Sequence, residues 1–202
     1  MRTIEQHIFR YDELSEQAQQ VATESMMGEI SSVRIESDSY EYRNALDKIA
    51  QIFRVNIYDW HVDEYNYYFR FDFVGIDEDI ENEPRLLLRY LNNNVLPCID
   101  NRKRYYTKGY TASRRSKIMF EDGYNRCLSG TWTDSAIDDA LNNIRRSLKK
   151  HLNAREFVES ILEGFFEQWQ NDYKYSISDK CISEEIEAND YEFYENGKPY
   201  FA

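Results

Sequence analysis

Residues 55–74, VNIYDWHVDEYNYYFRFDFV, carry the clearest β-strand pattern in this chain of 202 residues. The second half alternates two sets of side chains, namely Tyr67, Phe69, Phe71 and Phe73 against Tyr68, Arg70, Asp72 and Val74. The first half places Val55 and Ile57 on one side and Tyr58, Trp60 and Val62 on the other. A period of two predicts half-buried strands, so we expect a hairpin that turns near residues 61–64.

Two amphipathic helices are expected before this hairpin. Ser15 is a suitable N-cap for the first helix, and a polar break at residues 36–39 separates it from the second. The second helix has an apolar stripe made of Tyr42, Ala45, Leu46, Ile49 and Phe53. With a first strand at residues 2–11, this order predicts an α+β fold in which both helices pack on one small antiparallel sheet around the hairpin.

The C-terminal half is expected to be mainly helical. Pro84 suits the start of a short helix, which the acidic residues 77–83 would precede. Helices at residues 133–152 and from Asn153 onward are joined by almost no loop, which predicts an antiparallel helix pair. Ser178 caps a last short helix, and the dipeptide Asn196-Gly197 predicts a small terminal hairpin. No repeat or low-complexity linker interrupts the chain, so we expect a single domain over residues 1–202.

The composition argues against several kinds of active site. Seven glycines are few, and none of the patterns GxGxxG, GxxxxGK[ST] or GxSxG occurs, although phosphate-binding loops and nucleophile elbows need such glycines. Cys98, Cys127 and Cys181 are widely spaced and form no CxxC pair, which favours three ordinary thiols over a disulfide framework or a zinc site. No metal or cofactor is expected.

Catalysis has little support in the positions of the reactive side chains. The three histidines fall on separate elements without metal-binding spacing, and only His61 is close to carboxylates, those of Asp59, Asp63 and Glu64. A turn with solvated acids explains that arrangement equally well. Cys127 has no base fixed beside it, and a buried thiol accounts for it. We therefore expect a protein that is not an enzyme.

The net charge of −12 is unevenly distributed along the chain. Acidic residues concentrate at residues 77–83 and 179–195. We take these clusters as candidate partner-binding residues: Asp77, Glu78, Asp79, Glu81, Glu83, Asp179, Glu184, Glu185 and Glu187. Solvated surface charge that only keeps the protein soluble is the alternative interpretation.

Residues 101–126 form a basic, Tyr-rich insertion with eight Lys or Arg against two acids, a net charge of +6. Its candidate contact residues are Arg102, Lys103, Arg104, Tyr105, Tyr106, Lys108, Tyr110, Arg114, Arg115 and Lys117. Bases interleaved with tyrosines are typical of surfaces that track phosphates and stack on nucleobases. An intramolecular or subunit contact with the acidic remainder of the protein is the alternative, and the subunit contact would give a homodimer.

Four stretches resemble a family of phage and prophage proteins, mostly without an assigned function and in part labelled antitoxin-like. They are YDELSEQAQQVA at 11–22, VNIYDWHVDEYNYYFRFDF at 55–73, LSGTWTDSAIDDAL at 128–141 and YKYSISDKCISEEIEANDYEFYENGKPY at 173–200. The resemblance implies a virus-encoded accessory protein that acts in the bacterial cytoplasm. No apolar run is long enough to span a membrane, and no signal-peptide core occurs at the N-terminus, which agrees with that location.

Charge and resemblance together favour a non-enzymatic phage protein that binds and inhibits a host protein. A defence nuclease is the expected target, through acidic surfaces that mimic nucleic acid in the manner of anti-CRISPR or anti-restriction proteins. The alternatives are a nucleic-acid-binding module that uses residues 102–117, and an antitoxin-like protein.

Overall fold

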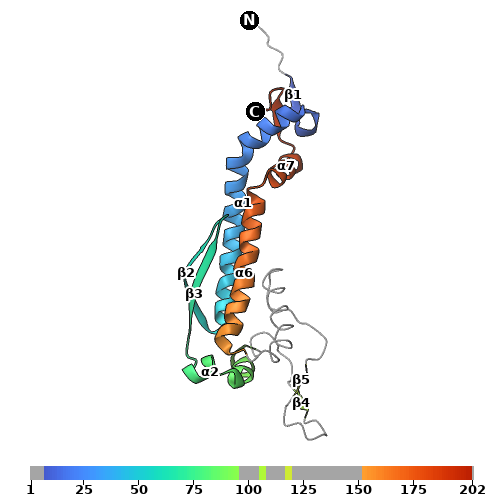
Figure 1. Cartoon of the computed structure of the whole chain (residues 1–202). Coiled ribbons are helices and arrows are strands. Elements are labelled where there is room, and N and C mark those ends of the chain that lie inside the picture. Colours follow the sequence, from blue (N-terminus) through green and yellow to red (C-terminus); the bar gives the residue numbers. More distant parts are fainter. Residues whose placement is uncertain (1–6, 96–104, 108–116, 120–151, 202) are drawn as a thin grey trace. The chain divides into compact units, whose positions relative to one another are not determined.

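The computed structural model describes residues 7–95, 105–107, 117–119 and 152–201, and it has an α+β fold (Figure 1). The N-terminal elements are β1 (Ile8–Arg10), η1 (Tyr11–Glu13), α1 (Glu16–Phe53), β2 (Val55–Val62) and β3 (Tyr67–Phe73). They are followed by α2 (Glu78–Asn82), η2 (Pro84–Leu86), α3 (Leu87–Tyr90), η3 (Leu91–Val95), β4 (Tyr105–Thr107) and β5 (Lys117–Met119). The C-terminal elements are α6 (Ala154–Ser176), α7 (Asp179–Ala188) and β6 (Glu192–Tyr194).

The chain divides into two compact units. We call Met1–Asn44, Trp60–Tyr68 and Phe166–Ala202 the acidic unit, for a reason given below, and Ala45–Asp59 and Phe69–Phe165 the second unit. The expectation of a single domain stays a prediction.

The predicted break at residues 36–39 is wrong, because α1 continues through it as one helix. The buried side of α1 instead changes along its length. Ala22 and Tyr42 are both buried, yet they are 20 residues apart and therefore about 160° apart around the helix at 100° per residue. The polar residues at the centre of α1 lie where one buried stripe gives way to the next, which made the sequence pattern look like two helices.

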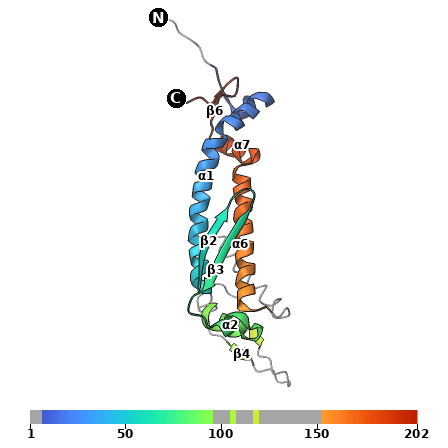
Figure 2. The ribbon, with the colours of Figure 1, turned by 60° about the vertical axis from the view of Figure 1, so that its left-hand side comes forward.

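The hairpin of β2 and β3 forms its own two-stranded sheet (Figure 2). In β3 the predicted aromatic face is confirmed, since its four aromatic side chains are buried or half-buried and the residues between them are exposed. In β2 the predicted alternation is wrong, because Tyr58 and Asp59 are both exposed and Asp59 has a φ of 50°. This local bulge returns Trp60 to the side of the strand that carries Val55.

The first strand does not join the hairpin, contrary to the expectation of one sheet. Within the acidic unit, β1 pairs antiparallel with β6, with Phe9 opposite Phe193. These strands cover a core of Leu14, Ala18, Ala22, Met26, Ile30, Ile182, Ile186 and Phe193. The predicted terminal turn is present, because the Gly197 N–H donates to the Tyr194 carbonyl over 2.9 Å and Gly197 has a φ of 80°.

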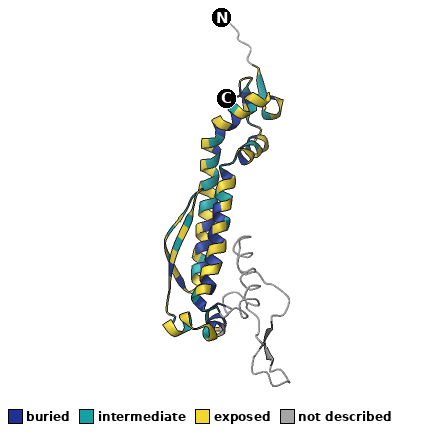
Figure 3. Cartoon of the chain, viewed as in Figure 1, coloured by how far each residue is buried: buried dark blue, intermediate teal, exposed yellow. Residues whose placement is uncertain are grey.

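A second part of the acidic unit packs α6 antiparallel against α1. Trp169 stacks on Tyr42 with 4.9 Å between the ring centroids, and Trp60 of the hairpin lies 5.1 Å from Trp169. Yellow and dark blue alternate around both long helices in Figure 3, as expected for helices that bury one side.

The second unit has an aromatic core of its own. Tyr90 is fully buried, and its hydroxyl donates to the Phe53 carbonyl over 2.7 Å. Phe73 packs edge-on against Tyr90 at 5.5 Å, and Phe53 packs against Phe157 at 6.2 Å. The acidic residues 77–83 precede η2 and α3, and Pro84 begins η2 as expected. The acidic residues also form a short helix of their own, α2, which the sequence pattern did not predict.

Helix starts were predicted well. Ser15 and Ser178 accept hydrogen bonds from the backbone N–H groups of Ala18 and Cys181, both over 3.3 Å. At the start of α6, Asn153 and Glu156 exchange side-chain and backbone hydrogen bonds of 2.8 and 3.0 Å, which is a capping box. The helix predicted at residues 133–152, and with it the predicted C-terminal helix pair, lies outside the described residues.

Candidate functional site

The net negative charge of the protein belongs to one of its two units. The acidic unit contains 20 Asp and Glu and 7 Lys and Arg, a net charge of −13. The second unit contains the other 17 acids and 18 bases, a net charge of +1. The acidic unit is therefore the region that can attract a basic partner.

The C-terminal acidic candidates lie on α7 and differ in their surroundings. Asp179, Glu184 and Glu187 are exposed, although Glu184 lies near Lys180 at 3.8 Å and accepts a hydrogen bond from the Tyr175 hydroxyl. Glu185 is half-buried and pairs with Arg34 of α1. The sequence places these residues in one cluster, but the structure commits Glu185 to an internal contact.

The other acidic candidates lie in the second unit. Asp77, Glu78, Asp79 and Glu83 are exposed, and Glu83 lies 3.3 Å from Arg85. Glu81 is mostly buried and pairs with Arg155 of α6 at 2.5 Å. Because Arg155 also lies over the ring of Phe71 at 5.1 Å, Glu81 serves the packing of this unit.

Seven of the ten basic candidates fall outside the described residues. Tyr105 and Tyr106 lie in β4 and Lys117 lies in β5, and these strands pair antiparallel with Tyr106 opposite Ile118. The remaining basic candidates, Arg102, Lys103, Arg104, Lys108, Tyr110, Arg114 and Arg115, lie outside the described ranges.

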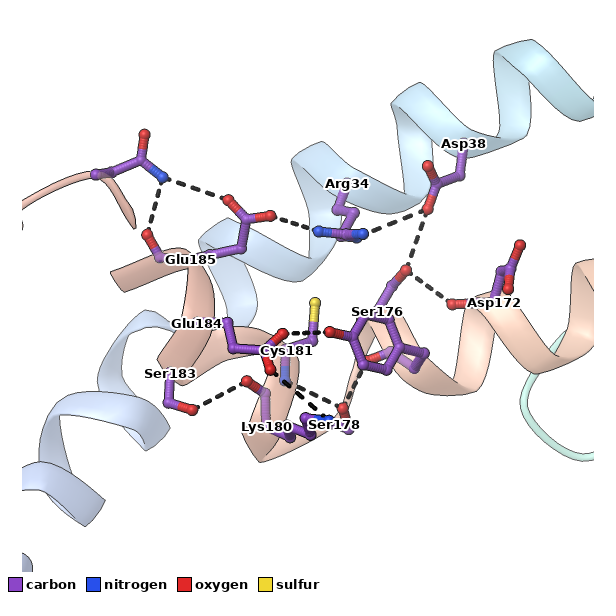
Figure 4. Close-up of polar contacts among 12 residues, drawn as sticks. Arg34, Asp38, Asp172, Ser176, Ser178, Lys180, Cys181, Ser183, Glu184 and Glu185 are labelled. Carbon is purple, nitrogen blue, oxygen red and sulfur yellow. Dashed lines mark hydrogen bonds and ion pairs between the residues drawn. The ribbon is translucent and has the colours of Figure 1, made fainter. Parts of the chain in front are cut away.

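A polar cluster inside the acidic unit was missed by sequence reasoning. It consists of Arg34 and Asp38 from α1, Asp172 and Ser176 from α6, and Glu185 from α7. Figure 4 shows Arg34 between Asp38 and Glu185. The distance from Arg34 Nε to Asp38 Oδ2 is 3.9 Å. The Ser176 Oγ lies 3.2 Å from Asp38 Oδ2 and 2.8 Å from the Asp172 carbonyl. The cluster therefore joins three helices.

Burial favours the protonated forms of two groups near the polar cluster, the Tyr42 hydroxyl and the Cys181 thiol. Burial and a hydrogen bond to Asp172 raise the pKa of the Tyr42 hydroxyl well above its usual value. Burial also raises the pKa of the Cys181 thiol against the opposing effect of Arg34. Both groups stay protonated at neutral pH, so neither supplies a nucleophile there.

His61 and Asp63 are close together, as the hairpin turn predicted. His61 Nε2 lies 2.7 Å from Asp63 Oδ2, and the Asp63 carboxylate also accepts the backbone N–H groups of Tyr65 and Asn66. Those backbone bonds, with His61, lower the pKa of Asp63. The Asp63 carboxylate therefore stabilises the hairpin turn. A structural role of this kind was the alternative to catalysis in the sequence analysis.

Other kinds of site have no support in the part of the chain that the structure describes. Within it, no group of three or more His, Cys, Asp and Glu side chains is placed to hold a metal ion. No described helix has the length and apolarity needed to cross a membrane. A shallow pocket of about 450 Å³ lies beside His7 and Tyr194, without a charged group buried in it.

No protein-family model, curated protein or solved structure matches this chain. The resemblance to phage and prophage proteins therefore stays a prediction, and function has to be argued from the residues themselves.

Proposed function

We propose that this protein is a non-enzymatic phage accessory protein that binds a basic, nucleic-acid-handling protein of the bacterial host and inhibits it. A defence nuclease is the target class that fits best. The proposal rests on one observation, the concentration of a net charge of −13 in the acidic unit.

The exposure of the acidic residues favours a role in binding a partner over a role in packing the acidic unit. Most carboxylates of the acidic unit are exposed, including Glu29 and Glu36 on α1 and Glu187 on α7. Exposed charges of one sign steer association with an oppositely charged surface and suppress the wrong partners. Duplex DNA is repelled by such a surface, whereas a protein channel built for DNA is attracted to it.

Capture from a bacterial lysate tests the proposal. The lysate is first treated with nuclease, so that nucleic acids do not bridge proteins, and the captured proteins are identified by mass spectrometry. We expect enrichment of proteins with basic nucleic-acid channels, release by salt, and displacement by excess duplex DNA. A captured nuclease should then lose activity when this protein is added.

Two results would contradict the proposal. One is recovery of no basic, nucleic-acid-handling protein. The other is capture that duplex DNA does not displace, because a partner that uses its nucleic-acid channel for this protein cannot bind both.

A second candidate function is nucleic-acid binding by the basic insertion. The pairing of β4 with β5 favours it, because it places two tyrosines and a lysine of the insertion, Tyr105, Tyr106 and Lys117, in one two-stranded sheet. A labelled single strand should then bind with an affinity that falls steeply with salt. No binding at about 50 mM salt would remove this candidate.

Self-association through the same insertion is a further prediction. The +6 insertion and the acidic surface of a second copy are complementary, and a two-fold contact would satisfy both copies. Light scattering at low salt should show a dimer that the double substitution Arg114→Glu and Arg115→Glu disperses. A monomer at tens of micromolar protein would exclude it.

A further inference from the structure

One side of α1 in the acidic unit exposes apolar and acidic residues in a regular order. Glu29, Val33, Glu36 and Tyr40 follow one another at intervals of four, three and four residues, and we call them the α1 stripe. Val33 is 65% exposed and Tyr40 is 69% exposed, and both glutamates are exposed. Intervals of three and four place all four side chains on one side of a helix over about 16 Å.

The α1 stripe lies on the opposite side of α1 from the polar cluster. Glu36 is two residues from Arg34, and Tyr40 is two residues from Asp38, so each lies about 160° around the helix from a member of the polar cluster. Arg43 is also on α1, and its guanidinium lies over the Trp60 ring, 5.8 Å from the ring centroid. No ion pair involves Glu29 or Glu36 within the described residues.

The chemistry of the stripe selects among possible occupants. A second copy that docks through the same stripe would bring two acidic units of −13 together, which is repulsive. Nucleic acid is repelled for the same reason. A basic protein surface is attracted, and an alternation of three and four residues is the spacing that another helix meets along its length.

We propose that the α1 stripe is the docking surface of the acidic unit, and that its occupant is a basic amphipathic helix of the partner protein. This inference rests on the proposed function and names the surface that carries it out. Lysines or arginines of the partner helix contact Glu29 and Glu36, and its apolar side chains pack on Val33 and Tyr40. Tyr40 is the expected anchor, because tyrosines supply a large share of binding energy at protein interfaces.

A synthetic peptide serves as the probe for this surface. It forms a helix with leucines at intervals of three and four residues flanked by lysines, and its control carries glutamate at every lysine position. Binding to the full-length protein is followed by fluorescence anisotropy. We expect the lysine peptide to bind and the glutamate peptide not to bind.

Matched substitutions locate the binding. The double variant Glu29→Gln and Glu36→Gln is compared with Glu41→Gln and Glu167→Gln, which are also exposed in the acidic unit and change the net charge equally. Tyr40→Ser is compared with Tyr65→Ser, because Tyr65 is 82% exposed on the hairpin turn. Circular dichroism confirms that each variant is folded.

The stripe variants should each weaken binding about tenfold or more, and the control variants by less than about threefold. Equal losses in stripe and control variants, or no binding of the lysine peptide to the unchanged protein, would overturn the inference. Equal losses would leave the proposed function standing, since general attraction to the acidic unit would remain. Stripe-specific peptide binding without capture of a nucleic-acid-handling protein would contradict the proposed function alone.

Discussion

The two units use their carboxylates differently. In the second unit, Glu81 and Asp72 both lie within 4 Å of Arg155, and acids and bases nearly balance. In the acidic unit, Arg34 forms half-buried ion pairs with Asp38 and Glu185. Most of the other acidic residues of this unit are exposed, and they outnumber its basic residues. Carboxylates that are alike in the sequence therefore have two roles: some hold elements together and others define a surface.

The largest expected difference in stability between the two units comes from two glycines with positive φ, one in each unit. A Cβ at Gly197 would overlap the Ala18 carbonyl oxygen of α1, whereas a Cβ at Gly75 of the second unit would meet nothing within 4 Å. We expect Gly197→Ala to destabilise the acidic unit by more than about 3 kcal/mol and Gly75→Ala by about 1 kcal/mol. Urea denaturation measures both, and equal effects would show that the terminal turn does not pack on α1.

Substitution of Arg34 tests whether the polar cluster stabilises the acidic unit. Arg34→Ala leaves Glu185 and Asp38 without their cation in a half-buried place, which should cost about 2 kcal/mol. Arg10→Ala breaks an exposed pair with Asp190 and should change stability by less than about 0.5 kcal/mol. Hydrogen exchange should also become faster in α7 of the Arg34 variant. Unchanged exchange there would mean that the cluster does not hold α7.

Arg155 is the corresponding test in the second unit. Arg155→Ala removes the partner of the mostly buried Glu81 and the contact with Phe71, so we expect a loss of about 1 to 2 kcal/mol. Arg85→Ala is the matched control, because its pair with Glu83 is exposed. A double-mutant cycle with Glu81→Gln separates the ion pair from the ring contact, and a coupling energy near zero would contradict the assigned role of Glu81.

Tyr42 gives a smaller effect with a defined pH dependence. Its folded pKa is raised above the unfolded value of about 10, so its contribution is complete below about pH 10 and is lost as the pH rises further. Tyr42→Phe should cost about 1 kcal/mol at neutral pH and should make the melting temperature fall less steeply above about pH 10. An identical alkaline slope in both proteins would show that Tyr42 does not keep its proton in the fold.

The sequence predicted local features well. The caps at Ser15, Asn153 and Ser178 and the turn at Gly197 depend on side chains within a few residues of the backbone groups that they serve. The aromatic face of β3 follows from strict alternation over one strand. These interactions are readable because both partners lie in the same short stretch.

The errors arose where distant residues decide the structure. Asp38 was read as part of a helix break, yet it accepts a hydrogen bond from Ser176, which is 138 residues away. Nothing local predicts the bulge at Asp59, since a single aspartate tolerates positive φ without requiring it. For the site, the charge clusters were visible in the sequence. Their division between two units was not, because it depends on which segments fold together.

Matched charge neutralisation of the two units tests the central claim most directly. One variant carries Glu29→Gln, Glu36→Gln, Glu187→Gln and Glu192→Gln in the acidic unit. The other carries Asp77→Asn, Glu78→Gln, Asp79→Asn and Glu83→Gln in the second unit, and all eight residues are exposed. Both variants lose four negative charges, and capture of nucleic-acid-handling proteins from lysate is compared at one salt concentration. The account predicts that capture is lost in the first variant and kept in the second, and equal capture by the two variants would contradict it.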